Sequence, residues 1–120
     1  MNKESIQKII DTSDKLRTLN FQKIRAKEKF EANSILGYEG GLFKVDSTLI
    51  LYLNYLLQSG RQTETILLDS NQNPILIKEV RSLLEAVQDK YYTALDIYHN
   101  DIKELNILKN STARYLNLEV

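Results

Sequence analysis

The chain has 120 residues, of which 42% are hydrophobic and 27% charged, a composition that fits one folded domain with a single modest core. Sixteen basic and sixteen acidic residues cancel, so the net charge does not favour binding to a polyanion. The absence of cysteine excludes disulfides, thiolate metal sites and cysteine nucleophiles. The N-terminal residues lack the pattern of a signal peptide, and no apolar run is long enough to span a bilayer, so we expect an intracellular protein.

The spacing of apolar residues predicts a first long helix over residues 3–33, which no glycine or proline interrupts. The polar residues Ser13 and Asn20 interrupt its predicted apolar stripe, which is therefore less regular than the stripe of the C-terminal helix described below. The apolar members of the stripe are Ile6, Ile9, Ile10, Leu16, Phe21, Ile24 and Phe30. We interpret the basic residues of this helix as a solvated face. The alternative is a phosphate-binding stripe, formed by Lys23, Arg25, Lys27 and Lys29.

The glycines Gly37, Gly40 and Gly41 predict a turn that leads into a short strand at 42–45. A second helix is expected over residues 48–59, capped by Asp46 or Ser47 and closed by Gly60. Apolar residues cover nearly every face of this helix, which predicts that it is buried on most sides, in the core or at a subunit interface.

A β-hairpin is predicted where two branched apolar runs, 65–68 and 75–77, flank an Asx- and Pro-rich turn. Together with the strand at 43–45 the hairpin could complete a three-stranded sheet. Asp69, Asn71 and Asn73 match the first ligand positions of a calcium-binding loop, but Pro74 and Val80 stand where that loop needs Gly and Glu. We therefore expect a turn and not a calcium site.

A third helix is predicted from residue 78 to about 110, followed by a partly apolar tail at 111–120. Apolar residues three and four apart form one stripe along about eight helical turns, roughly 43 Å. A stripe that long predicts contact with another helix or with another copy of the chain. The predicted interface residues are Val80, Leu84, Val87, Tyr91, Ala94, Tyr98, Ile102, Leu105 and Leu108.

No arrangement of residues in the sequence predicts catalysis, a cofactor or a metal site. The single histidine, His99, has no second imidazole within reach along the chain, and no nucleophile-elbow motif occurs. The acidic pairs Asp96/Asp101 and Glu85/Asp89 are expected to be solvated helix charges. The tyrosines are expected to pack rather than to stack on nucleic-acid bases.

Three segments carry a resemblance to a known group of proteins: Phe30–Ser34, Gly40–Val45 and Leu67–Ile75. Across roughly residues 28–98 the chain resembles small uncharacterised proteins of T4-like bacteriophages (myoviruses) of marine bacteria. The resemblance implies a bacteriophage origin and brings no activity, cofactor or site residues with it.

The sequence thus predicts one α+β, mostly helical domain with two long antiparallel helices, a short buried helix and a small sheet. Our leading hypothesis is a non-enzymatic structural or assembly protein that acts through coiled-coil-like helix contacts, with a protein partner or by self-association as a homo-oligomer. There are two alternatives. One is an adaptor that binds a host protein, and the other is a nucleic-acid accessory protein. No membrane contact and no small-molecule substrate is expected. We expect the protein in the host cytoplasm when it is synthesised. If it is a component of the particle, we expect it in the virion.

Overall fold

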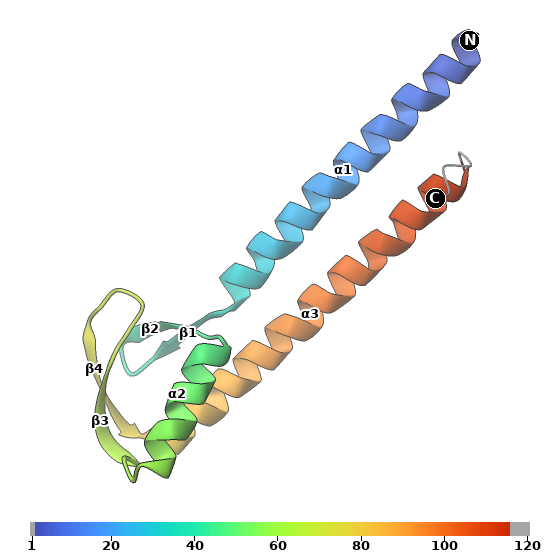
Figure 1. Cartoon of the computed structure of the whole chain (residues 1–120). Helices are drawn as coiled ribbons and strands as arrows, with labels where there is room; N and C mark the ends of the chain where they lie inside the picture. The colour runs from blue at the N-terminus through green and yellow to red at the C-terminus, as the bar shows by residue number, and fades with distance from the viewer. Residues whose placement is uncertain (1, 116–120) are drawn as a thin grey trace. The chain divides into compact units, whose positions relative to one another are not determined.

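In its described part the chain is mostly helical, with three helices and two small antiparallel sheets (Figure 1). The computed structural model describes the backbone of residues 2–115 and the side chains of residues 2–108 and 110. The helices and strands follow one another in the order α1 (Lys3–Asn33), β1 (Ile35–Tyr38), β2 (Gly41–Lys44), α2 (Ser47–Gln58), β3 (Thr63–Leu68), β4 (Pro74–Glu79) and α3 (Val80–Tyr115). The predicted α+β, mostly helical class is confirmed.

Contacts within the chain divide it into two compact units. Unit 1 contains the described residues up to Lys29 and those from Ile97 onward, and unit 2 is Phe30–Asp96. Each unit takes one part of α1 and one part of α3, whereas α2 and all four strands belong to unit 2.

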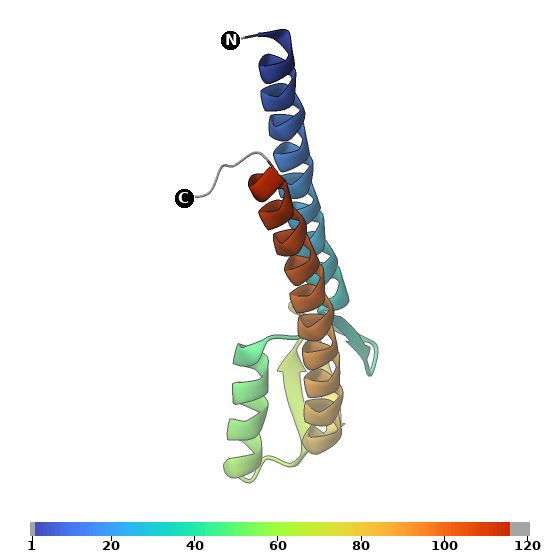
Figure 2. The same cartoon turned by 90° about the vertical axis from the view of Figure 1, so that its right-hand side faces the viewer.

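Unit 1 is a pair of antiparallel helical segments, one from α1 and one from α3 (Figures 1 and 2). Two side-by-side contacts define the antiparallel direction. Lys29 lies beside Asp101, and Leu19, ten residues earlier in α1, lines the same hollow as Leu108. The predicted antiparallel pairing of the two long helices is therefore present within this unit.

Unit 2 places α2 and the first turns of α3 against the β3–β4 hairpin (Figure 2). One hydrophobic cluster joins all of these elements and also takes Phe43 and Val45 from the β2 segment. Side chains from α2, β4 and α3 are completely buried in it, namely Leu53, Ile77, Val80, Leu83 and Val87. The core of unit 2 therefore lies where two helices and a β-hairpin meet.

The ends of α2 follow the predicted capping residues. The Oδ1 atom of Asp46 accepts a hydrogen bond from the backbone N–H of Leu49 at 2.8 Å, which makes Asp46 the N-cap. The helix closes at Ser59, and Gly60 follows with a φ of 83°. The predicted cap and the predicted left-handed glycine are both confirmed.

The glycine-rich turn is tighter than the sequence indicated, because it joins two paired strands. β1 pairs with β2 from Ile35↔Lys44 to Tyr38↔Gly41, and Glu39 and Gly40 both have positive φ, 50° and 81°. Two central residues with positive φ form a type I′ turn, the connection that suits a two-residue hairpin. β1 itself was not predicted.

The predicted three-stranded sheet is wrong, because β1–β2 and β3–β4 are two separate two-stranded sheets. β3 pairs with β4 from Thr63↔Glu79 to Leu68↔Pro74, so the predicted hairpin is present and longer than expected. The two sheets meet through the turn that follows β3: Ser70 donates its backbone N–H to the carbonyl of Leu42 at 2.8 Å. The third helix begins at Val80 instead of residue 78, because Lys78 and Glu79 still belong to β4.

Candidate protein-interaction surfaces

The nine predicted interface residues of α3 are mostly covered by the chain itself. Val80 and Val87 are completely buried, Ala94 is 1% exposed, Leu84 7% and Leu105 9%. Tyr91, Tyr98 and Ile102 are half-buried, and Leu108 is 53% exposed. The stripe was predicted to meet another helix or another copy of the chain. Other elements of the same chain cover most of it, and among the described residues only its C-terminal end is open to a second molecule.

The physical reason is that the chain supplies two different covers for this stripe. In unit 2 the α2 and hairpin residues Leu53, Leu56, Leu67 and Ile77 share one cluster with Val80, Leu84 and Val87. In unit 1 the α1 segment covers Leu105, since Ala26 and Leu105 line the same hollow and both are buried. The α1 cover corresponds to the predicted antiparallel pairing of the long helices, whereas the cover by α2 and the hairpin was not predicted.

The buried face of α1 in unit 1 is not the stripe that the sequence predicted. The buried residues are Thr12, Leu19 and Ala26, spaced seven apart as one position of a heptad repeat. Of the seven residues in the predicted stripe, only Leu16 and Phe30 are half-buried. The other five are 44–60% exposed: Ile6, Ile9, Ile10, Phe21 and Ile24.

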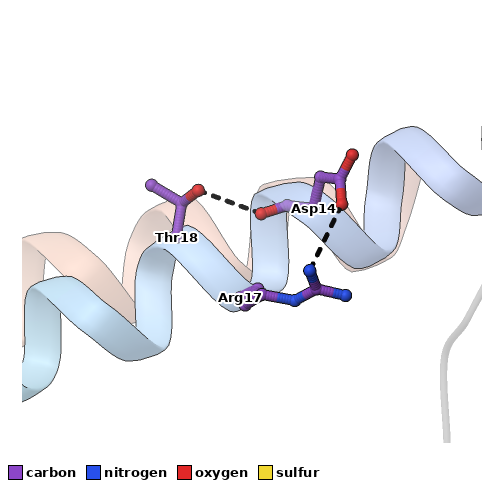
Figure 3. Close-up of polar contacts among 3 residues, drawn as sticks. All are labelled: Asp14, Arg17 and Thr18. Atoms are coloured by element: carbon purple, nitrogen blue, oxygen red, sulfur yellow. Dashed lines mark hydrogen bonds and ion pairs between the residues drawn. The ribbon is translucent and has the colours of Figure 1, made fainter.

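Four of these exposed apolar residues and two charged ones form a single stripe on α1, which we call the outer stripe. It lies within about 80° of the helix circumference and nearly opposite the buried face, at 3.6 residues per turn. At its centre Asp14 and Arg17 form an exposed ion pair at 4.0 Å (Figure 3). The outer stripe consists of Ile6, Ile10, Asp14, Arg17, Phe21 and Ile24.

The basic residues near the end of this α1 segment are partly neutralised by α3. The Nζ of Lys29 lies 3.6 Å from an Oδ2 of Asp101. Arg25 lines the same hollow as Lys29, with Glu104 on the opposite wall. Lys27 is exposed and Lys23 half-buried. These four residues therefore do not form one continuous cationic strip, which weakens the phosphate-binding alternative.

In unit 2 the outward face of α2 exposes three large side chains. Leu51 is 69% exposed, Tyr55 61% and Tyr52 48%, although the sequence predicted burial on most sides. Leu53 and Leu56, on the opposite face, are buried in the core. No charged residue occurs in Ser47–Gln58, so the outward face of α2 is apolar, aromatic and uncharged. Such a composition is typical of the centre of a protein interface.

The outward face of the β3–β4 hairpin is also apolar. Ile66 is paired with Leu76 across the strands, and the two side chains are 65% and 49% exposed. Leu68, two residues further along the same face, is 60% exposed. Alternation of buried and exposed residues along β3 places Thr65 and Leu67 on the inner side. The exposed members were predicted as strand residues but not as surface.

Asp69 stabilises the predicted Asx turn and also makes a contact with β2 that the sequence did not predict. Its Oδ1 accepts hydrogen bonds from the backbone N–H groups of Asn73 at 2.8 Å and Asn71 at 3.0 Å, and its Oδ2 accepts one from Leu42 at 3.1 Å. The bond from Asn73 is the largest cause of a lowered pKa of Asp69, which burial opposes and the bonds from Leu42 and Asn71 reinforce. The motif that resembles a calcium loop thus holds the hairpin turn and joins it to β2.

Other polar residues singled out by the sequence lie apart from one another. His99 is exposed on α3 and lines a shallow hollow with Lys103 and Asn106. Among the described residues no three His, Cys, Asp or Glu side chains are grouped so that they could hold a metal ion. None of the helices, within the part of the chain that is described, is long and apolar enough to cross a membrane.

Comparisons with protein-family models, with curated proteins and with solved structures found no match.

Proposed function

We propose that this protein is a non-enzymatic structural or assembly component of a bacteriophage, which acts through helix-mediated contacts with other proteins. The observation that carries the proposal is the outward face of α2, where Leu51, Tyr52 and Tyr55 are exposed on a helix without charged residues. Exposed apolar groups that are adjacent on one face indicate a contact site more strongly than scattered ones. The resemblance of residues 28–98 to phage proteins supports the setting.

The face of α2 has the features of a helix that packs against a partner helix. Leu51 and Tyr55 are four residues apart, so they lie one turn apart on the same side. Tyrosine contributes a large apolar area and a hydroxyl that can hydrogen-bond at the edge of a contact. The inner residues Leu53 and Leu56 hold this helix in the core, so the outward residues are presented by a fixed element.

Mass spectrometry of purified virions and of assembly intermediates tests the proposal. The chain should be present at a reproducible copy number in one of them, and absence from both would contradict the proposal. A double variant, L51K with Y55K, should fold normally and lose incorporation, because the charges would have to be desolvated in the contact. The matched control is Q62K, which adds a charge at an exposed position outside α2, between that helix and β3.

A further inference from the structure

We infer that the outer stripe of α1 is self-complementary and that a second copy of this chain docks on it in antiparallel orientation. The inference deepens the proposed function, on which it rests, by naming the partner of one helix. Four of its side chains are large, apolar and 44–60% exposed: Ile6, Ile10, Phe21 and Ile24. Asp14 and Arg17, between them, are 64% and 72% exposed.

The order of residue types along the stripe is nearly the same in both directions. From the N-terminus it runs two apolar residues, one acidic, one basic and two apolar residues. When the stripe is reversed end to end, apolar residues fall on apolar residues, the acidic residue falls on the basic one, and the basic residue falls on the acidic one. A two-fold interface requires this property, because each position meets its counterpart on the other copy.

An antiparallel pair centred between residues 15 and 16 satisfies every position of the stripe. Ile10 then meets Phe21 of the second copy, and Ile6 meets Ile24 of the second copy within one residue. Asp14 meets Arg17 of the second copy, and the two-fold axis generates that pair twice. The intrahelical Asp14–Arg17 contact of 4.0 Å shows that both groups already lie on this face (Figure 3).

The distribution of charge along α1 favours the same orientation. Residues 3–14 contain two basic and three acidic residues, a net charge of −1. Residues 15–29 contain six basic and one acidic residue, a net charge of +5. An antiparallel pair places each basic half beside the slightly acidic half of the other copy, whereas a parallel pair would place the two basic halves together.

The size of the stripe sets the expected strength of the contact. Ile6 and Ile24 are separated by about 27 Å along the helix, at 1.5 Å per residue. A single helix face of this length is smaller than a standard interface, so we expect a dimer that dissociates in the micromolar range, on the order of other small interfaces.

Charge reversal at the centre of the stripe tests the proposed pairing. In sedimentation-velocity measurements, R17D should weaken dimerisation at least about tenfold, because Asp14 would then meet an acidic residue of the second copy. D14R should weaken it similarly. The double variant D14R/R17D should recover the wild-type dissociation constant within about threefold, since it restores opposite charges across the axis.

The control is K27E, which reverses one exposed charge of the same helix outside the stripe and should leave dimerisation nearly unchanged. Failure of the double variant to recover would overturn the inference. Because that variant also restores the ion pair within α1, an equimolar mixture of R17D and D14R chains is measured as well, in which opposite charges meet only across the axis. This mixture should form a heterodimer, and its failure to do so would overturn the inference. A wild-type chain that stays monomeric at several hundred micromolar would overturn it as well.

Introduced cysteines report the orientation directly, since the natural chain has none. Under mild oxidation, a mixture of I10C and F21C chains should form a mixed disulfide dimer, and neither variant alone should cross-link. Dimers of I10C alone and of F21C alone would indicate parallel helices and overturn the inference. Detection in virions decides the proposed function separately, so a monomeric chain found in the particle would remove the inference and leave that function standing.

Discussion

The two units of this chain use the same type of helix with very different amounts of core. In unit 2 the side chains of Leu53, Ile77 and Val87 are completely buried among α2, the hairpin and α3. In unit 1 the best-covered apolar side chains are Leu19, Ala26 and Leu105, and each keeps 7–9% of its surface exposed. Unit 2 therefore has enough buried apolar side chains to stabilise its own fold, whereas the contact between the two helices of unit 1 contributes little stability.

A long amphipathic helix obtains its stability from the elements on which it packs. In a folded protein most of the stability of an amphipathic helix comes from the packing of its apolar face and not from intrinsic helix propensity. The α3 segment in unit 2 packs on two elements, and the α1 segment in unit 1 packs on one, through the small side chains of Thr12 and Ala26. We expect the larger stability in the part that contains the larger core.

The largest effect is expected for L53A, which removes a completely buried side chain of α2. The lost contacts and the cavity should lower the free energy of unfolding by about 2–5 kcal/mol, measured by urea denaturation. L51A, two residues away and 69% exposed in the native chain, is the control and should change it by less than about 0.5 kcal/mol. Equal effects of the two variants would contradict the assigned faces of α2.

A smaller effect is expected for L19A in unit 1. Among the described residues Leu19 lines one hollow with Leu108 of α3 and lies outside the main hydrophobic cluster, so its truncation should cost at most about 2 kcal/mol. Hydrogen exchange should accelerate for amides of residues 12–26, while the amides of Leu67 and Ile77 keep their protection. A loss as large as that of L53A, with exchange accelerated equally in both units, would show that the units do not differ in core strength.

The third prediction concerns the carboxylate of Asp69 and its pH dependence. Because its pKa is lowered in the folded chain, chiefly by the Asn73 hydrogen bond, ionised Asp69 stabilises the fold above the unfolded-state pKa of about 3.9. This stabilisation is lost as the pH falls through the lower folded-state pKa. D69N should lower the melting temperature by several degrees at neutral pH, and the difference should shrink below about pH 4. Thermal melts followed by circular dichroism measure both.

D89N, which removes an exposed carboxylate from α3, is the control for D69N and should leave the neutral-pH melting temperature unchanged. A constant difference between D69N and the wild type from neutral pH to about pH 3 would contradict the role of the ionised carboxylate.

The smallest effect is expected for the ion pair between Lys29 and Asp101. Their side chains are 56% and 32% exposed and 3.6 Å apart. K29M should lower the free energy of unfolding by less than about 1 kcal/mol, and about 1 M salt should remove most of the difference. K27M is the matched control. A loss that high salt leaves unchanged would mean that Lys29 acts through the packing of its aliphatic carbons.

Local sequence signals predicted most of the elements and their ends. Asp46, Gly60 and the Asx-Pro turn act on residues next to them, so their effects could be predicted without the fold. β1 was missed because its four residues include Gly37 and do not alternate between apolar and polar types, although their burial does alternate. The two sheets are linked by contacts between distant residues, such as the hydrogen bond from Ser70 to Leu42, and local patterns contain no information about such partners.

The faces of the helices were harder to predict than their ends. α1 carries apolar residues on nearly opposite sides, and the larger ones, Phe21 and Ile24, are on the exposed side. The larger apolar side chains led to the prediction that the wrong face of α1 is buried. The seven-residue spacing of Thr12, Leu19 and Ala26, which marks the buried face, was nevertheless present in the sequence. In α2, apolar residues surround the helix, so periodicity alone could not separate Leu51 and Tyr55 from the buried Leu53.

The Asp69 carboxylate also has a consequence for the order of folding. It accepts hydrogen bonds from its own turn and from Leu42, 27 residues earlier in the chain. The turn can form while the chain is otherwise open, whereas the bond to Leu42 requires closure of a long loop and is therefore slower. The Asp69 side chain thus takes part first in the formation of its own turn and later in the docking of that turn on β2. We therefore expect the two hairpins to reach the native state together, although they share no strand.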